Sequence, residues 1–152
     1  MPLTTFNKAY CYWSRNFLAW PKFRVAQPNA THFGLSAWER SDRFGWLLTQ
    51  NVDGLHTKAG SSKVTELHGS GHRVRCMECD FTSDRDSFQS MMAAANPSWT
   101  EKDAPGELNP DGDVTIEKGA EETFNVVPCP NCGGIMKTDV VFFGDNVSRK
   151  VV

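Results

Sequence analysis

The chain has 152 residues, of which 39% are hydrophobic and 22% are charged, and its formal net charge is -2. These values are typical of a globular protein, and a chain of this length can bury about two thirds of its unfolded surface. The chain lacks the excess of basic residues that is typical of nucleic-acid-binding proteins. No apolar run approaches the roughly 18 to 20 residues that cross a bilayer. The sequence therefore predicts one domain or one and a half, with neither of these partners.

The N-terminal residues 1–28 are rich in aromatic side chains, with Pro21 and Pro28 as breaks, which predicts an irregular segment that contributes to a core or lines a pocket. The segment has neither the apolar stretch of a signal peptide nor the composition of an organelle presequence. Asn29 follows as a helix N-cap, and apolar residues recur after it at helical spacing. We expect this helix to end near Ser41.

The next segment, residues 44–49, is a short apolar run that predicts a strand covered on both faces, as in a parallel α/β sheet. Gln50, Asn51, Asp53 and His56 follow directly. Open α/β sheets place their ligand sites there, beyond the carboxyl ends of the strands. The stretch TQNVDGLH therefore predicts a ligand-binding loop.

A turn is expected over residues 58–62, followed by a short strand from Val64 that leads to His68. The glycine after His68 permits close approach of a ligand, and imidazole suits a general base at neutral pH. A single histidine is more often structural than catalytic. Together with residues 49–56, which we call the polar loop, His68 predicts that the two segments converge on one cleft.

Two C-x-x-C pairs, Cys76 with Cys79 and Cys129 with Cys132, predict a tetrahedral zinc site with four thiolate ligands. Disulfides are the alternative, which a reducing compartment and this spacing disfavour. Four cysteines close the coordination shell, so the zinc is expected to be structural. The fifth cysteine, Cys11, is expected to be a buried apolar residue without a chemical role.

Between and after these pairs the texture of the sequence changes three times. Ser83 with Asp86 is typical of a capping box, and it precedes a helical stripe that ends at Asn96. Residues 98–123 are rich in proline, glycine and acidic residues, which predicts an exposed insertion loop. The run VVFFGD at residues 140–145 predicts a second buried strand that ends in a glycine turn.

Taken in order, TQNVDGLH, ELHG, the two C-x-x-C pairs and VVFFGD resemble the catalytic core of the sirtuins, the NAD-dependent protein deacylases. Finer features such as YWSRNFLAWPKF, NPSW and PDGDV resemble the mitochondrial class II branch of that family. The resemblance covers nearly all of the chain. It implies an α/β fold class, namely an incomplete Rossmann-like parallel-sheet domain with a small zinc-ribbon domain. The implied domains are residues 1–70 (NAD and substrate), 71–137 (zinc, with an exposed insertion at about 96–124) and 138–152 (return strand).

The resemblance also implies roles for individual residues. Gln50, Asn51, Val52 and Asp53 match the positions that hold the nicotinamide and ribose of NAD, and Asn51 is counted with the catalytic residues. His68 matches the group that accepts a proton from a ribose hydroxyl. The implied reaction transfers the acyl group of a protein lysine to ADP-ribose and releases nicotinamide in the mitochondrial matrix. Transfer of ADP-ribose to protein and cleavage of lipoamide are implied as further activities.

For the partners, the resemblance implies acylated lysines of protein substrates, one structural zinc ion at the four cysteines, and NAD. The substrate peptide is expected to pair as an added strand with the last predicted strand, in which main-chain hydrogen bonds give affinity. The matching residues are Val140, Val141, Phe142, Phe143 and Gly144. His56 is then expected to be a structural hydrogen-bonding residue of the polar loop.

This chain also departs from the family pattern. The glycine-rich turn that wraps the pyrophosphate is absent, and residues 69–71 do not continue as G-x-G-x-x-G. The later strands of the sheet are missing as well. The resemblance therefore leads us to expect a chain truncated at both ends, marginally stable, and weak or inactive alone because it binds NAD poorly.

The main alternative is a non-enzymatic zinc-ribbon module that binds protein or nucleic acid. Charges of both signs surround the first cysteine pair, which argues against a nucleic-acid footprint. A third interpretation is a fragment without catalysis that acts as a dominant-negative partner. The charges around the first cysteine pair are those of three basic and four acidic residues, namely Arg73, Arg75 and Arg85 against Glu78, Asp80, Asp84 and Asp86.

Overall fold

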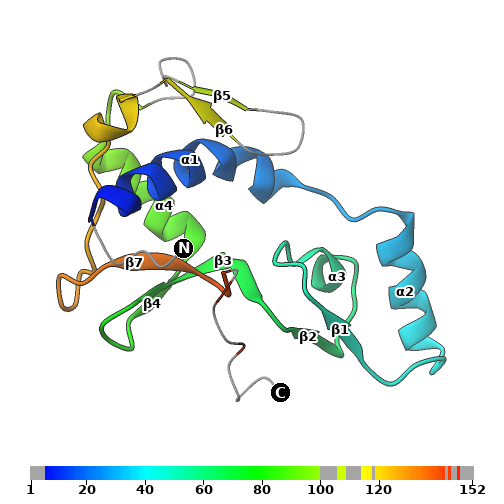
Figure 1. Ribbon diagram of the computed structural model, residues 1–152. Helices are drawn as coiled ribbons and strands as arrows, with labels where there is room; N and C mark the ends of the chain where they lie inside the picture. Colours follow the sequence, from blue (N-terminus) through cyan, green and yellow to red (C-terminus); the bar gives the residue numbers. More distant parts are fainter. Residues whose placement is uncertain are drawn as a thin grey trace. The chain divides into compact units, whose positions relative to one another are not determined.

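The computed structural model describes residues 6–99, 106–108, 114–117, 119–142, 144 and 147. The chain forms two units, which we call the loop unit (residues 26–73 and 138–152) and the cysteine unit (residues 2–25 and 74–137). Strands β3 (Gly69–Cys76) and β7 (Met136–Val140) run from one unit into the other (Figure 1). Residues 2–25 belong to the cysteine unit, and the predicted domain boundaries stay a prediction.

The loop unit is built around two parallel strands, in which Leu47 lies opposite Val64. Asn29 caps its first helix, because the side chain accepts hydrogen bonds from the N–H groups of Thr31 and His32. This cap and the helix end before Ser41 confirm the prediction for this segment. The elements are α2 (Ala30–Arg40), β1 (Leu47–Thr49), α3 (Leu55–Lys58) and β2 (Val64–Glu66).

The strand predicted over residues 44–49 is shorter than expected and is not covered on both faces. β1 contains three residues, and the side chains of Trp46 and Leu48 are 59% and 62% exposed. Within the described part of the chain, β1 pairs with β2 alone. The prediction of a fully buried strand is therefore wrong for this structure.

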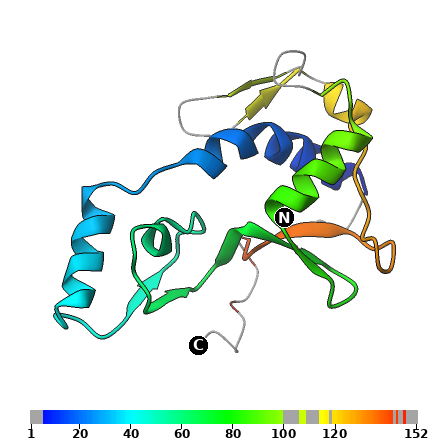
Figure 2. The same cartoon turned by 180° about the vertical axis from the view of Figure 1, so that it is seen from behind.

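The cysteine unit packs two helices against a three-stranded sheet of order β4–β3–β7. Figures 1 and 2 show α1 and α4 side by side. Their buried side chains form an apolar core with those of the sheet, namely Ala9, Trp13, Phe17, Val74, Phe88, Met92 and Met136. The remaining elements are α1 (Phe6–Val25), β4 (Thr82–Asp84), α4 (Arg85–Ala95), β5 (Gly106–Leu108), β6 (Val114–Ile116) and a 3-10 turn η1 (Ala120–Thr123).

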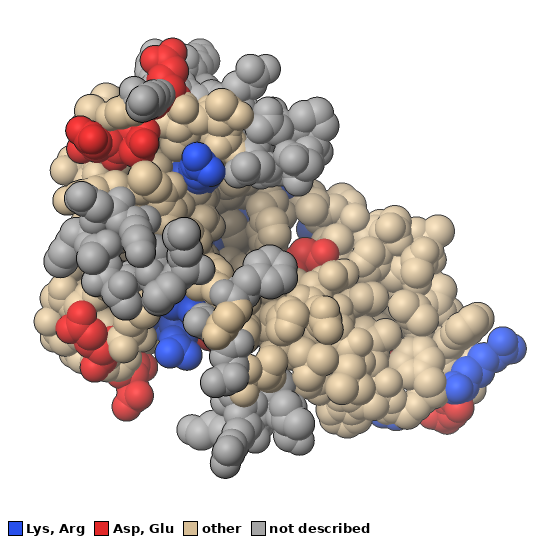
Figure 3. Space-filling view, viewed as in Figure 1, with Lys and Arg blue, Asp and Glu red and all other residues tan. Residues whose placement is uncertain are grey.

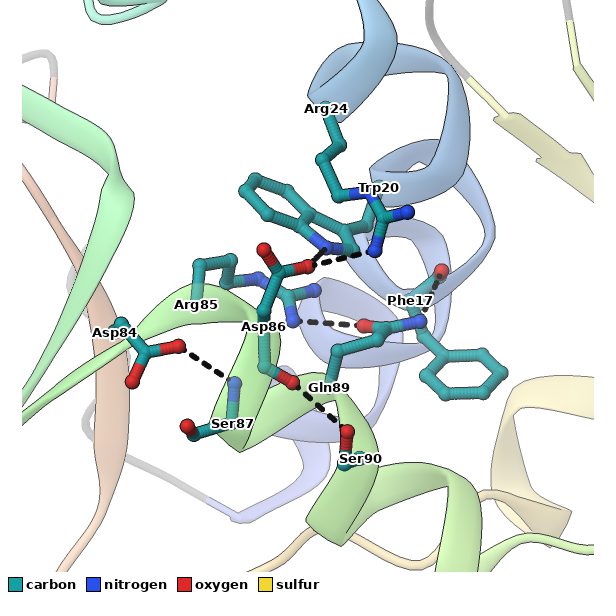
Figure 4. A network of polar contacts seen from close by, with 9 residues as sticks. All are labelled: Phe17, Trp20, Arg24, Asp84, Arg85, Asp86, Ser87, Gln89 and Ser90. Carbon is teal, nitrogen blue, oxygen red and sulfur yellow. Dashed lines mark hydrogen bonds and ion pairs between the residues drawn. The ribbon is translucent and has the colours of Figure 1, made fainter.

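The N-terminal segment is a 20-residue helix, α1, so the prediction of an irregular segment is wrong. Its aromatic residues recur at helical spacing, and Trp13 and Phe17 are buried. Pro21 lies inside the helix and lacks the N–H that would bond to the carbonyl of Phe17. The side chain of Gln89 donates to that carbonyl at 3.0 Å instead, which compensates the helix for its proline (Figure 4).

Two other findings concern the surface of the described helices. Cys11 on α1 is exposed, with its sulfur 3.9 Å from a carboxylate oxygen of Glu121, so the prediction of a buried thiol is wrong.

No helix in the described part of the chain combines the length and apolar character needed to cross a bilayer.

Helix α4 begins with a different cap from the one predicted. The carboxylate of Asp84 accepts a hydrogen bond from the N–H of Ser87 at 2.7 Å. The predicted capping box of Ser83 and Asp86 is therefore wrong by one residue at its start. The helix ends before Asn96, as predicted.

Where it is described, the segment 98–123 is not the exposed loop that the sequence predicts. Trp99 and Val114 are 3% and 1% exposed, and β5 pairs with β6 in antiparallel fashion. Asn96 and Asn125 close its base, because the N–H of Asn125 donates to Asn96 Oδ1 at 2.6 Å and Asn96 Nδ2 donates to Asn125 O at 2.9 Å. The residues between β5 and β6 lie outside the described residues.

The last predicted strand is displaced along the chain, because β7 ends at Val140 instead of beginning there. Val141 and Phe142 follow the strand and are half-buried. Phe143 lies outside the described residues. Gly144 has a positive φ of 94°, as expected for the predicted glycine turn.

Candidate functional site

Four cysteine thiols converge in the cysteine unit. Cys76 ends strand β3 and Cys79 follows in a turn, while Cys129 and Cys132 flank the turn before β7. The four sulfur atoms lie within 4.8 Å of one another. The distance is 3.5 Å between Cys76 and Cys132 and 3.7 Å between Cys79 and Cys129. Zinc–sulfur bonds of about 2.3 Å place tetrahedral sulfurs about 3.8 Å apart, so the cluster fits one structural zinc ion.

Backbone and side-chain donors surround these sulfurs. The N–H of Glu78 lies 3.3 Å from the sulfur of Cys76, and the N–H of Gly134 lies 3.4 Å from that of Cys132. Such donors stabilise thiolate, which is the form that binds a metal ion. The two turns therefore prepare the thiols for a cation.

The pKa values of two thiols, Cys79 and Cys132, indicate that the cluster needs a cation before all four thiols can ionise. The side chain of Asn131 donates to Cys79 and is the main cause that lowers its pKa to about 7. For Cys132, the N–H of Gly134 acts to lower the pKa, but the thiols of Cys79 and Cys76 outweigh it and raise the pKa to about 12. Four crowded thiols cannot all ionise without a positive charge between them, and a divalent cation supplies that charge.

In the loop unit, a shallow pocket with about 160 Å³ of empty space lies beyond the carboxyl end of β1. Asn51, Asp53, His56 and Glu66 contribute polar side chains to its lining, together with Thr49. Amide, carboxylate and imidazole groups can donate to and accept from a polar ligand. The pocket therefore has the chemistry of a site for a ligand with hydroxyl or amide groups.

Short-range hydrogen bonds shape this polar loop. The N–H of Asn51 donates to Thr49 Oγ1 at 3.1 Å, and the N–H of Leu55 donates to Asp53 Oδ1 at 3.0 Å. Gly54 between them has a positive φ of 67°, which lets the chain turn sharply into α3. Asp53 Oδ1 thus accepts from the start of α3, and the carboxylate retains further acceptor capacity for a ligand.

His68 connects β2 and β3 and is half-buried. Its carbonyl oxygen accepts a hydrogen bond from the N–H of Val141 at 2.9 Å. The next residue, Gly69, has a φ of 77°, and a Cβ atom at this position would overlap the carbonyl oxygen of Asp139. The backbone of residues 68–69 therefore lies directly against the end of β7 and Val141.

His56 lies on α3, and its ring centroid is 4.7 Å from that of His32. Its Nδ1 atom is buried and lacks a hydrogen-bond partner among the described residues. Burial lowers the pKa of His56 most, the His32 ring lowers it further, and Asp53 acts in the opposite direction. The surroundings of His56 therefore favour its neutral imidazole.

The structure brings some of the predicted site residues together and leaves others apart. Asn51 and Asp53 line the pocket, whereas Gln50, Val52 and His68 are not among its lining residues. The roles inferred for these three residues, and the cleft that His68 was expected to share with the loop, stay predictions.

Two residues of the site were not predicted. Glu66 lines the pocket and lies 3.6 Å from the guanidinium of Arg73, which also donates to Asp139 at 3.1 Å. His72 Nε2 lies 3.0 Å from the carbonyl oxygen of Asp53. A carboxylate at the end of a strand is a signal that could have identified Glu66. The contact of His72 depends on the fold and leaves no sign in the sequence.

Comparison with known proteins gives a consistent result. The model of the Sir2 family matches residues 2–152. The NAD-dependent protein deacylase sir-2.2 of Caenorhabditis elegans is 59% identical over 142 residues, which are 93% of this chain and 50% of that protein. Sirt4 of Drosophila melanogaster is 52% identical over 138 residues (91% and 44%). The mitochondrial lipoamidase sirtuin-4 of Homo sapiens is 49% identical over 137 residues (90% and 43%). The chain spans about half the length of the curated relatives it matches.

Solved structures show the same likeness in three dimensions. A Sir2 homologue in complex with ADP-ribose has a TM-score of 0.67 at 27% identity and covers 99% of this chain and 48% of its own. A Sir2 homologue in complex with NAD has a TM-score of 0.58 at 29% identity, with 88% and 41% covered. Together with the parallel strand pair and the cysteine cluster, these likenesses confirm the predicted fold class and the predicted similarity to sirtuin-4.

Proposed function

Since this chain belongs to the Sir2 family, we propose that it carries part of the active site of an NAD-dependent protein-lysine deacylase. In this reaction the acyl group of a lysine passes to ADP-ribose, and nicotinamide is released. One observation carries the proposal: Asn51 and Asp53 line a single polar pocket in a chain that the family model matches over residues 2–152.

We assign the binding of NAD to Gln50, Asn51, Val52 and Asp53. The amide side chains suit the carboxamide of nicotinamide, and the carboxylate of Asp53 suits a ribose hydroxyl. When bound, NAD supplies an electrophilic ribose carbon with nicotinamide as its leaving group. The residues of the loop bind and orient this group and take no part in proton transfer.

His68 is assigned the role of general base, which accepts a proton from a ribose hydroxyl. The segment Val140, Val141, Phe142, Phe143 and Gly144 is assigned the acyl-lysine peptide, bound as an added strand. The hydrogen bond from the N–H of Val141 to the carbonyl of His68 supports this pair of roles, since it joins the base to the peptide segment.

The four cysteines are assigned one structural zinc ion that takes no part in the reaction. Four thiolates complete a tetrahedral shell, so no position stays open for a water molecule or a substrate. The zinc ion is therefore expected to stabilise the cysteine unit alone.

The test is the variant His68→Tyr in the protein extended to the length of its relatives. We expect nicotinamide release in the presence of NAD and an acyl-lysine peptide to be abolished, with the zinc content unchanged. An active variant that retains its zinc would contradict the proposal. Cys11→Ser, which lies outside both sites, is the control and should keep full activity.

The 152-residue chain alone is expected to bind NAD weakly and to have little or no activity. Its pocket encloses almost no space of its own, whereas typical ligand sites enclose roughly 300 to 1,000 Å³. Calorimetry of the purified chain with NAD checks this expectation. A micromolar dissociation constant would contradict it.

Finer features of the function follow from the named relatives. The bovine and human relatives are called mitochondrial lipoamidases, so we propose the mitochondrial matrix as the location and lipoyl-lysine as one substrate. Transfer of ADP-ribose to protein is proposed as a second activity, because it begins with the same loss of nicotinamide. Comparison of acetyl-lysine and lipoyl-lysine peptides measures the acyl preference, and labelled NAD measures the transfer.

A non-enzymatic zinc-ribbon module that binds protein is the second candidate, favoured by the apolar core that the cysteine unit possesses. Binding to nucleic acid is disfavoured, because the chain has a net charge of -2 and no basic excess. On the face in Figure 3 the described Lys and Arg side chains lie apart. Zinc binding without nicotinamide release, at the length of the relatives, would favour this candidate.

A further inference from the structure

The first residues of β3 hold the backbone of the polar loop. The N–H of Gly71 donates to the carbonyl oxygen of Val52 at 2.8 Å, and Nε2 of His72 lies 3.0 Å from the carbonyl oxygen of Asp53. Two successive residues of the strand thus bind two successive carbonyls of the loop. These carbonyls belong to the segment that presents Asn51 and Asp53 to the pocket.

The imidazole of His72 also lies next to Gly54, the residue at which the chain turns into α3. A Cβ atom built on Gly54 would lie 3.4 Å from Cδ2 and 3.7 Å from Nε2 of His72. The ring therefore lies where a side chain at position 54 would contact it. A larger residue at position 54 would meet the ring as well as the strain of a positive φ.

The hydrogen bond to Asp53 determines which nitrogen of His72 carries a proton. A carbonyl oxygen only accepts, so Nε2 must be the donor. This donor is present in one neutral tautomer and also in the protonated ring. The contact therefore survives protonation, unlike the action of a general base, which requires a free nitrogen.

We propose that His72 is a positioning residue of the polar loop, which fixes the backbone at Asp53 and thereby the direction of its carboxylate. The chain of contacts is short: His72 binds the Asp53 carbonyl, and Asp53 Oδ1 accepts from the N–H of Leu55. The loop is thus bound on its backbone side by β3 and on its side-chain side by α3. The effect on NAD rests on the proposed function, whereas the effect on the loop does not.

Three variants separate a donor from a ring that fills space. His72→Gln places a donor nitrogen at the ε position, as in the imidazole. His72→Asn places the donor one bond closer to the backbone, out of reach of Asp53. His72→Phe retains a ring but has no donor.

Amide hydrogen exchange of the 152-residue chain, resolved by NMR, measures the loop directly. We expect exchange in residues 52–58 to be faster in His72→Phe and His72→Asn by on the order of threefold to tenfold, the loss of one hydrogen bond. His72→Gln should restore the wild-type rates. The amide of Leu47, which bonds to Lys63 between β1 and β2, should keep its rate in all variants.

Two results would overturn the proposal. One is wild-type exchange in residues 52–58 of His72→Phe, which would reduce His72 to a space-filling ring. The other is faster exchange at Leu47 and residues 52–58 alike, which would make His72 a general stabiliser of the loop unit. Arg75→Gln, an exposed residue on the same strand, is the control and should change neither region.

A second readout links the loop to NAD. In the protein extended to the length of its relatives, His72→Phe should raise the KM for NAD more than it lowers kcat, with no change in the pH dependence of kcat. A pH dependence that disappears in His72→Phe would overturn the positioning role in favour of a base. If the wild-type protein does not use NAD, the proposed function fails, and the exchange measurement still decides the role of His72.

Discussion

Gly69 is a residue of the loop unit at which no side chain fits. Gly69 has a φ of 77°, and its Cα faces the carbonyl oxygen of Asp139 with no room for a Cβ atom. Gly69→Ala should therefore cost more than the roughly 1 to 2 kcal/mol that a left-handed backbone costs an L residue. The free energy of unfolding from urea titration checks this.

Gly119→Ala is the matched control, because Gly119 has a similar φ of 88° but no neighbouring atom within 4 Å of its Cβ position. The loss of stability in Gly119→Ala should therefore equal the cost of the left-handed backbone alone. Equal losses in the two variants would mean that the backbone near Asp139 moves aside without cost.

The imidazole of His56 is a second feature at the scale of one residue. Burial and the neighbouring ring of His32 hold its pKa below the ordinary value of 6.5. Below pH 6.5 the unfolded state therefore binds the proton more readily than the folded state, and the free energy of unfolding falls as the pH drops. NMR titration should give a pKa below 6.5 for His56.

His32→Ala removes one of the two causes and should raise the pKa of His56 part of the way towards its ordinary value. A pKa of His56 at or above 6.5 in the wild-type chain would show that Asp53 outweighs burial. The variant should also weaken the acid-induced loss of stability, measured as the difference in thermal midpoint between pH 7 and pH 5.5.

At the scale of elements, one arginine joins the two helices of the cysteine unit (Figure 4). Arg85 at the start of α4 is 1% exposed, and its guanidinium carbon lies 5.3 Å and 4.8 Å from the ring centroids of Trp13 and Trp20 on α1. It donates to Gln89 at 2.7 Å and to the carbonyl of Asn16 at 3.1 Å. Because Arg85 donates to Gln89 Oε1, the amide nitrogen of Gln89 is free to donate to the carbonyl of Phe17. This bond replaces the one that Pro21 cannot make.

Arg85→Ala is expected to destabilise the chain by on the order of 3 kcal/mol, because it removes two cation–π contacts of a buried guanidinium and its hydrogen bonds to Gln89 and to the Asn16 carbonyl. Arg24→Ala is the control. Its ion pair with Asp86 has side chains that are 57% and 56% exposed, so the loss should be about 1 kcal/mol or less. Chemical denaturation of both variants measures the difference, and similar losses would contradict it.

The elements also show what the sequence can predict. The Asn29 cap and the two C-x-x-C turns were predicted, because each depends on residues that are close in the chain. α1 was missed, because its proline is compensated by Gln89, which is 68 residues further along the chain than Pro21. A pattern of neighbouring residues cannot reveal such a partner.

The same distinction applies to the candidate site. Asn51 and Asp53 follow a predicted strand, so their shared pocket could be expected from the rule for strand ends. His72 binds the loop through a contact between residues 19 positions apart, and Trp99 is buried by packing that the loop-like composition around it conceals. These features depend on tertiary structure and appear only when the chain is folded.

The cysteine unit depends on its metal ion at the scale of the whole molecule. Cys76 and Cys129 are buried members of its apolar core, so the zinc site and the core share side chains. We expect one zinc ion per chain by elemental analysis. Removal by a chelator should abolish the near-ultraviolet circular dichroism of the buried Trp13 and Trp99, and added zinc should restore it.

Cys132→Ser should lose the zinc and the same signal, whereas Cys11→Ser should retain both, because Cys11 lies outside the cluster. An unchanged signal after complete removal of zinc would show that the core of the cysteine unit is sufficient without the ion.

The two units differ most in how much apolar surface they bury. The core cluster lies entirely in the cysteine unit, whereas Ala59 is the single buried hydrophobic residue among the described residues of the loop unit. Apolar burial is the main source of stability, so the loop unit should open at a lower free energy than the cysteine unit. In the zinc-bound chain, hydrogen exchange should be fast at Leu47 and Leu67, which join β1 and β2, and slow at the amides of Phe88 and Met92 in α4. Equal protection in the two sets would mean that polar contacts such as those of Glu39, which accepts from Ser62 and Lys63, stabilise the loop unit as well as a core does.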